Sequence, residues 1–220
     1  MTYPEALAYV SGLEPRGWRL GLDRMQAFID RAGLSQNVGR PPGTDPAGKP
    51  GARFIHVAGT NGKGSVTAFL QSMLVEHGYR TGAFFSPYVV DPRERVQFGR
   101  SLISESDFAS VVAHLKPIAE SFSETEFGGI TEFEFKTAVG VEYWRRKRCE
   151  WVALEVGLGG RLDATNVVHP ACSAIVSIGY DHTQILGDTL EKIAFEKAGI
   201  VKPETPLVVG DVPEPARRVI

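Results

Sequence analysis

A glycine-rich segment between an apolar run and an amphipathic run limits the fold of this chain more than any other feature. The apolar run is RFIHVA at 53–58, and apolar residues recur at helical spacing from 66 to 74. Successive backbone N–H groups in such a loop, together with a helix N-terminus and the Lys63 cation, attract phosphate oxygens. We therefore expect strand, phosphate loop and helix, the alternative being a plain glycine-rich turn. The residues expected to hold phosphate are Gly59, Thr60, Asn61, Gly62, Lys63, Gly64 and Ser65.

The segment departs from the phosphate-loop pattern GxxxxGK[ST] at two positions. Val57 stands where the pattern has its first glycine, and Gly64 stands where it has the hydroxyl residue that binds the metal. A Mg²⁺ ion beside this loop would need oxygen ligands from elsewhere. The ends of neighbouring parallel strands are the natural source, because ligands bind there in open α/β sheets.

Strand and helix patterns alternate through the rest of the chain. Further strands are expected at 81–86, 151–156, 172–178 and 206–209, and helices at 65–77, 107–120, 131–148 and up to 198. Alternation of this kind predicts an α/β fold, a mainly parallel sheet flanked by helices. We expect Asp188 to open the last helix through a capping box, DTLE.

Two short regions precede the phosphate loop. Residues 1–35 are expected to form two helices, with Asp23 in a position to cap the second. Residues 39–51 (GRPPGTDPAGKPG) are rich in glycine and proline, and we expect a mobile loop there. We treat 1–220 as one domain that includes both regions.

Three polar residues lie at predicted strand ends and are candidates for metal ligands: Ser86, Glu155 and His182. A carboxylate in the apolar strand WVALEV is costly to bury unless it is paired or binds a metal, so an ion pair between Glu155 and Arg161 is the alternative. For His182 the alternative is an ordinary surface histidine. Lys197, near a helix end, is on its own pattern a solvated cation.

Composition excludes several classes of function. The chain has 24 basic and 26 acidic residues among 220, which argues against nucleic acid as a partner. No apolar stretch is long enough to span a membrane, and the N-terminus lacks the pattern of a signal peptide. Two cysteines make neither a disulfide framework nor a metal cluster. A cytoplasmic protein with no membrane partner is the expectation.

Seven motifs follow one another in a familiar order: HVAGTNGKGS, SPYVV, ERV, TEFEF, LEVGLGGRLDATN, DHTQILG and EKAGI. In these the chain resembles folylpolyglutamate synthase/dihydrofolate synthase, a branch of the Mur ligase family, from LGLDR near residue 20 onward. The resemblance implies a Rossmann-like ATP-binding domain with a phosphate loop. It also implies that Thr60 to Lys63 hold ATP, that Ser86, Glu155 and His182 bind Mg²⁺, and that Lys197 carries a carbamate for a second Mg²⁺; Lys63 and Lys197 are the catalytic candidates.

The resemblance also implies the substrates. The segments expected to contact a pterin are Leu20, Gly21, Leu22 and Asp23, then Thr131, Glu132, Phe133 and Glu134, and finally Leu162. Tyr88 departs from the family, which usually has histidine after Ser-Pro. Family members also carry a C-terminal glutamate-ligase domain beyond the length of this chain. We therefore expect a partial chain that binds Mg-ATP weakly and turns over little.

The function implied is an ATP-dependent amide ligase. It would join L-glutamate to dihydropteroate, to the glutamyl tail of folates, or to both, through an acyl phosphate, and we expect a monomer. The alternatives are a nucleotide-binding module without catalysis and a phosphotransferase acting on a hydroxyl group. An intact metal set with Lys197 argues against the first, and Gly64 serves the second poorly.

Overall fold

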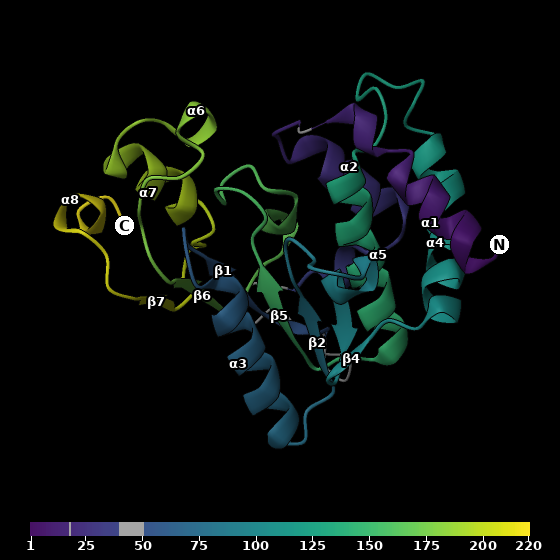
Figure 1. Cartoon of the computed structure of the whole chain (residues 1–220), viewed down its shortest axis with the longest axis horizontal. Helices are drawn as coiled ribbons and strands as arrows, with labels where there is room; N and C mark the ends of the chain where they lie inside the picture. Colours follow the sequence, from purple (N-terminus) through teal and green to yellow (C-terminus); the bar gives the residue numbers. More distant parts are fainter. Residues whose placement is uncertain (18, 40–50) are drawn as a thin grey trace.

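A single mixed sheet lies at the centre of the computed structural model, which describes residues 1–17, 19–39 and 51–220 (Figure 1). Its strand order is β4-β3-β2-β5-β1-β6-β7. Neighbouring strands from β2 to β7 run parallel, whereas β3 and β4 form an antiparallel edge. The strands are β1 (Arg53–Ala58), β2 (Thr81–Phe84), β3 (Val96–Phe98), β4 (Ser101–Leu102), β5 (Trp151–Glu155), β6 (Cys172–Ile175) and β7 (Leu207–Val209).

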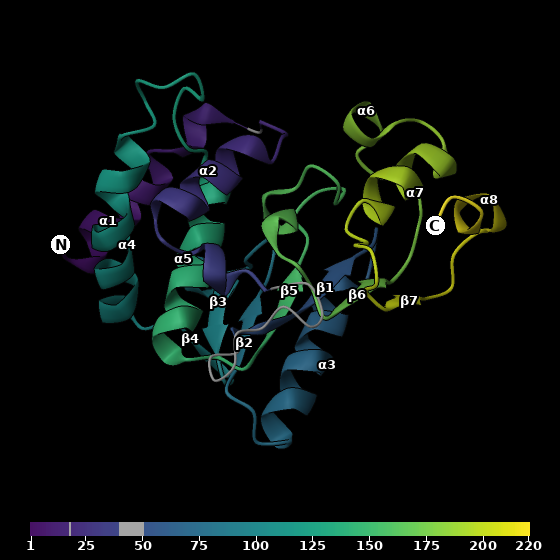
Figure 2. The ribbon, with the colours of Figure 1, turned by 180° about the vertical axis from the view of Figure 1, so that it is seen from behind.

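Helices gather at the two ends of the sheet, as the front and back views show (Figures 1 and 2). One group, beside the β4 edge, contains α1 (Tyr3–Ser11), α2 (Asp23–Arg31), α4 (Glu105–Glu120) and α5 (Glu132–Lys147). The other, beside β7, contains α6 (Thr183–Leu186), α7 (Leu190–Ala198) and α8 (Glu214–Arg217). Helix α3 (Lys63–Glu76) packs against β1, β2 and β5. Short 3₁₀ turns are η1 (Glu14–Arg16), η2 (Ser35–Asn37), η3 (Pro92–Arg95) and η4 (Ala164–Val167).

The larger hydrophobic core joins the first helix group to the sheet. Trp144 of α5 lies on β2 so closely that a Cβ atom at Gly82 would be 2.4 Å from the indole. Its ring contacts Phe54 and Phe84 edge-on, at centroid distances of 6.3 and 6.4 Å. A smaller core holds α6, α7 and α8 on β6 and β7. The central strands are therefore fixed from both ends, and their carboxyl ends keep a defined relative position.

The predicted architecture is confirmed, with corrections at the helix starts. Asp23 is the first residue of α2, Leu22 takes the N-cap position, and no described side chain caps that helix. In α7 the cap is Thr189, which accepts from the Lys192 N–H, rather than Asp188. The antiparallel strands β3 and β4 were not predicted, since each is at most three residues long. The expected Gly/Pro loop at 39–51 lies outside the described residues over 40–50.

None of the helices in the described part of the chain has the length and apolar character needed to cross a bilayer.

Candidate active site

The glycine-rich loop joins β1 to α3, as predicted, and is fastened to the segment that follows β6. The Thr60 N–H donates to the Ser177 carbonyl (2.9 Å) and the Asn61 N–H donates to Ser177 Oγ (3.0 Å). Gly62 occupies the N-cap of α3 in the left-handed region, at φ 80°, and no described side chain caps the helix. The first-turn N–H groups of α3 therefore have no side-chain cap among the described residues and could receive an anion.

Lys63 extends from the first turn of α3 across this loop. Its Nζ atom donates to the Thr60 carbonyl at 3.2 Å, and its side chain reaches the cavity described below. The cation is thus held beside the N-terminus of α3, where both favour the same negatively charged group. That this group is a phosphate stays a prediction.

Two of the three metal candidates meet at the ends of β2 and β5. The Ser86 N–H donates to Glu155 Oε2 at 3.1 Å, and Arg95 donates to Ser86 Oγ at 3.0 Å. Glu155 is 4% exposed, and burial raises its pKa against the opposing effects of the Ser86 N–H, Lys63 and Arg95. The alternative pairing of Glu155 with Arg161 is wrong: Arg161 pairs with Glu196 at 2.8 Å.

Gly64 lies directly beside the Glu155 carboxylate. A Cβ atom there would lie 3.4 Å from Glu155 Oε2, so a larger residue would fill the space beside this carboxylate. The departure from the phosphate-loop pattern at Gly64 therefore coincides with a carboxylate brought in from β5. The position of the Glu155 carboxylate beside Gly64 suits a cation bound next to the loop.

His182 lies across the cavity, at the N-cap of α6, and is partly exposed. Its backbone is in the left-handed region (φ 47°), and its Nε2 atom is 3.7 Å from Asp181 Oδ1. Among the described residues, no three or more histidine, cysteine, aspartate and glutamate side chains cluster tightly enough to hold a metal. The structure therefore brings Ser86 and Glu155 together and places His182 on the same cavity, without completing a protein-only site.

Lys197 is buried instead of solvated, so the expectation from its helix-end position is wrong. It is 4% exposed, and its Nζ atom donates to the Gly59 carbonyl at 2.9 Å. Burial, with repulsion from Lys63 as a smaller cause, lowers the pKa of Lys197 to about 8. A buried amine with a lowered pKa against the phosphate loop is unusual, and such groups concentrate at functional sites.

A cavity of about 480 Å³ unites the loop with the segments predicted to bind a pterin. From the phosphate side it is lined by Lys63, Ser86 and His182. The predicted pterin-contact residues in its wall are Leu20, Gly21, Thr131, Glu132, Phe133, Glu134 and Leu162. Leu22 and Asp23 are not among the described lining residues, because they form the start of α2.

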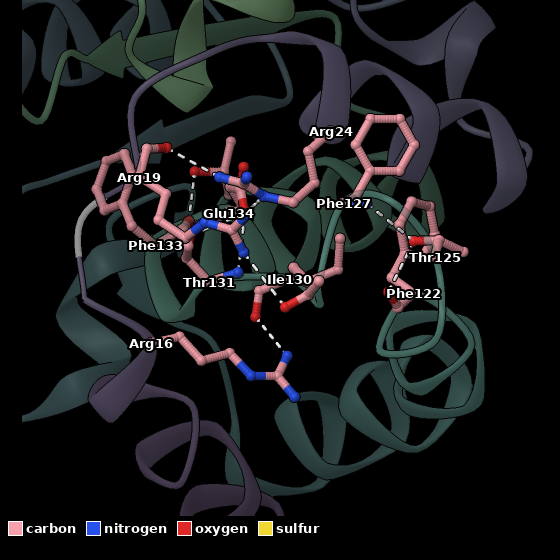
Figure 3. A network of polar contacts seen from close by, with 12 residues as sticks. Arg16, Arg19, Arg24, Phe122, Thr125, Phe127, Ile130, Thr131, Phe133 and Glu134 are labelled. Carbon is pink, nitrogen blue, oxygen red and sulfur yellow. Dashed lines mark hydrogen bonds and ion pairs between the residues drawn. The ribbon is translucent and has the colours of Figure 1, made fainter.

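The TEFE segment has a structural role of its own, seen in Figure 3. Thr131 caps α5 in a capping box with Glu134, whose Oε2 atom accepts from the Thr131 N–H (2.8 Å) and hydroxyl (2.9 Å). The same oxygen accepts from Arg24 Nε at 2.8 Å, and Arg24 also donates to the Arg19 carbonyl at 2.9 Å. Glu134 Oε1 is buried and has no partner among the described residues. One carboxylate thus joins α2 to α5, and one of its two oxygens has no donor among the described residues.

Two lining residues received no role from the sequence. Arg95, in the ERV motif, supports Ser86, and Asp163, in LEVGLGGRLDATN, is 5% exposed and faces the cavity. Both belong to motifs that carry the family resemblance. Their place in these motifs is the sequence signal that could have marked them as site residues. Their contacts depend on how η3 and the loop after β5 fold, which spacing does not reveal.

Comparison with known proteins decides the family. No family model matches the chain. It is 42% identical over 219 residues to the dihydrofolate synthase/folylpolyglutamate synthase of Bacillus subtilis, covering 99% of this chain and 48% of that protein. The chain belongs to the folylpolyglutamate synthase/dihydrofolate synthase family. It spans about half the length of the curated relatives it matches.

Solved structures of the family share the fold along the whole chain. The apo form of Lacticaseibacillus casei folylpolyglutamate synthase superposes with a TM-score of 0.86 at 32% identity, over 100% of this chain and 50% of that one. Escherichia coli FolC in complex with DHPP and ADP gives 0.83 at 34% identity, over 100% and 48%. The sheet, the loop and the surrounding helices described above are therefore the family architecture.

Proposed function

We propose that this chain supplies the ATP-binding half of a ligase that joins L-glutamate to dihydropteroate, to the glutamyl tail of folates, or to both. The observation that carries the proposal is the single cavity in which Lys63 and Ser86 face Thr131–Glu134 and Leu162. A nucleotide phosphate and an acceptor carboxylate bound there would be neighbours. The E. coli relative was solved with both DHPP and ADP, which supports this pairing of ligands.

The first step is proposed to form an acyl phosphate. A carboxylate oxygen of the acceptor attacks the γ-phosphorus of ATP, the bond from that phosphorus to the bridging oxygen breaks, and ADP leaves. The N–H groups at the start of α3 and the Lys63 ammonium would hold the phosphates and offset the charge on the transferring group. Fixing the two reactants side by side would supply much of the remaining acceleration.

The second step is proposed to form the amide. The amine of L-glutamate attacks the acyl carbon, a tetrahedral intermediate forms, and its carbon–oxygen bond to phosphate breaks as the amine loses its proton. Exclusion of water would protect the acyl phosphate, and buried residues such as Glu134 and Asp163 form part of the cavity wall.

Ser86, Glu155 and His182 are proposed to hold Mg²⁺, which when bound neutralises phosphate charge. Glu155 suits this role because it is a buried carboxylate beside a glycine that leaves room for a cation. For a second Mg²⁺ we propose a carbamate on Lys197. Carbamylation needs a neutral amine, and burial lowers the pKa of Lys197 to about 8, which makes that form accessible near neutral pH.

On the acceptor side we propose that the unpartnered Glu134 Oε1 accepts an N–H of the pterin ring. A buried carboxylate oxygen without a donor is costly, and a ligand N–H would satisfy it. Leu20, Gly21 and Leu162 would supply the apolar walls of the same site. Retention of both segments favours dihydropteroate as one of the acceptors.

The test is glutamate-dependent phosphate release from ATP by the protein made from its complete reading frame, with dihydropteroate and a reduced folate assayed in parallel. Release with either acceptor, abolished in Glu155→Ala, is the expected result. ATP binding without release for either acceptor would contradict the ligase and favour a nucleotide-binding module.

A further inference from the structure

His56 is a fully buried histidine in the middle of β1, the strand that leads into the phosphate loop. It is 0% exposed, and its Nε2 atom lies 2.9 Å from Thr165 Oγ1. The Thr165 hydroxyl in turn bonds to Asp163 Oδ1. These three side chains form a buried row that runs from β1 to the wall of the cavity.

The direction of the row follows from proton counting. Asp163 also accepts from the Thr165 N–H at 3.0 Å and from the Leu158 N–H at 2.8 Å. Burial raises the pKa of Asp163, and these hydrogen bonds oppose that effect by favouring the ionised carboxylate. Beside an ionised Asp163, Thr165 gives its one hydroxyl proton to the carboxylate and accepts from His56. It follows that His56 is the neutral tautomer with its proton on Nε2.

The environment of His56 agrees with this tautomer. Burial lowers the pKa of His56 to about 3, so the ring stays neutral. Its Nδ1 atom is buried and finds no partner within the described chain. An apolar side chain would fill the same position without that unsatisfied acceptor, so the Nε2–H donor is what a histidine adds here.

Asp163 accepts hydrogen bonds from its own loop and is buried from solvent. Its two oxygens receive the Leu158 N–H and both donors of Thr165, and the Gly157 N–H also acts on it, so protein donors account for its roughly four acceptor positions. Gly157, Leu158, Leu162 and Ala164 of this loop all line the cavity. The orientation of Asp163 therefore sets the shape of this wall.

We propose that His56 is a positioning residue: through Thr165 and Asp163 it fixes the loop 157–163 that forms the acceptor wall, and it ties that wall to the strand bearing the phosphate loop. The proposal rests on the proposed function for the identity of the acceptor. The row of hydrogen bonds itself does not depend on it.

The first test reads the tautomer and the loop directly, on the 220-residue chain. Nitrogen-15 NMR is expected to show His56 with its proton on Nε2 and no titration between about pH 5 and 8. Amide exchange at Leu158 is expected to be slow in the wild type and in His56→Gln, which keeps a donor, and faster in His56→Leu. A proton on Nδ1, or equal exchange in all three proteins, would overturn the proposal.

The second test is kinetic and uses the protein from the complete reading frame. His56→Leu and Thr165→Val are expected to raise the KM for the acceptor about tenfold with the KM for ATP unchanged. His56→Gln and Thr165→Ser, which keep the donor and the hydroxyl, are expected to restore the wild-type KM. Equal KM values in all four variants, or a parallel rise for ATP, would overturn the positioning role.

The two failures are distinguishable. A wild type that turns over neither acceptor would contradict the proposed function, and the NMR measurements would still decide the hydrogen-bond row. If the wild type is active but substitution of His56 does not change the KM for the acceptor, the proposed function is supported and the positioning role of His56 is contradicted.

Discussion

The two sides of the cavity are built in different ways. On the phosphate side the glycine-rich loop is one contiguous segment, Gly59–Ser65, which offers backbone N–H groups and one lysine, and Ser86 and His182 lie beside it. The acceptor side gathers side chains from η1 to α2, from the start of α5 and from the loop after β5. It is held by contacts between residues more than a hundred positions apart, such as Arg24 with Glu134. A local motif supplies the main part of one side, and buried contacts between distant residues make the other.

Because of this difference, we expect substitutions on the two sides to have different effects. Backbone donors survive most side-chain substitutions, so the phosphate side should depend on glycine geometry and on Lys63. The acceptor side depends on buried polar groups, and removing one partner leaves the other unsatisfied. The four predictions below use that contrast, and each pairs an expected effect with a control measurement in which that effect should be absent.

The largest effect is expected for Arg24→Leu. Removing the arginine leaves Glu134 buried without its charge partner, and we expect a loss of about 3–5 kcal/mol in the free energy of unfolding. Urea unfolding of the chain measures it. The double variant Arg24→Leu/Glu134→Gln is expected to recover part of the lost free energy of unfolding, because glutamine leaves no unpaired buried charge at position 134. ADP affinity of the folded Arg24→Leu protein should match the wild type, and a weakened affinity would break the separation of the two sides.

Lys63→Ala is expected to act on the phosphate side alone. It removes the cation at the loop, and we expect ATP turnover by the complete protein to fall by about 10²–10³-fold with stability nearly unchanged. Steady-state phosphate release is the measurement. Lys192→Ala removes an exposed lysine of α7 paired with Asp188 and serves as the matched control. A drop of similar size in the control would show that the effect is not local.

His56 should make stability depend on pH. Its folded pKa is lowered from 6.5 to about 3, so between these values the unfolded state binds the extra proton and stability falls as pH drops. Between pH 7 and 5 the wild type should lose about 2 kcal/mol more than His56→Gln, measured by urea unfolding at each pH. His77→Gln, at an exposed histidine of the same chain, should follow the wild type. Parallel curves for wild type and His56→Gln would contradict the buried neutral ring.

Gly62→Ala is expected to give the smallest change and the cleanest contrast. Gly62 (φ 80°) and Gly78 (φ 83°) share the left-handed conformation, so alanine at either should lower stability by about 1 kcal/mol. A Cβ atom at Gly62 would also meet Val176 at 3.2 Å, whereas at Gly78 no described atom lies within 4 Å. Calorimetric titration with ADP should show weaker binding for Gly62→Ala only. Equal weakening in Gly78→Ala would mean that the loop geometry is not specific.

The same contrast explains what the sequence could predict. Strand, loop and helix at 53–76 follow from local periodicity and glycine placement, and β1 begins and ends where the pattern predicts. The candidates Ser86 and Glu155 follow from the rule that ligands collect at strand ends, and the structure brings those two residues together. His182 shares their cavity, although its distance from them does not follow from the rule.

Other features could not be predicted because they depend on tertiary contacts. Lys197 has the pattern of a solvated helix end, and only the packing of α7 against the phosphate loop buries it. The TEFE segment was assigned to the pterin by resemblance, and its capping box and its pair with Arg24 emerge only when α2 meets α5. Asp163 and Arg95 gain roles from loops whose course no periodicity encodes.

The central claim is that one cavity brings the acceptor carboxylate against the phosphate held at Lys63. Isotope transfer tests it most directly. Dihydropteroate labelled with oxygen-18 in its carboxyl group would be incubated with ATP, L-glutamate and the protein from the complete reading frame, and the released phosphate analysed by mass spectrometry. The account predicts that each phosphate released during amide formation carries one labelled oxygen from the acceptor. Unlabelled phosphate accompanied by amide product would contradict attack of the carboxylate on ATP, and with it the joint use of this cavity.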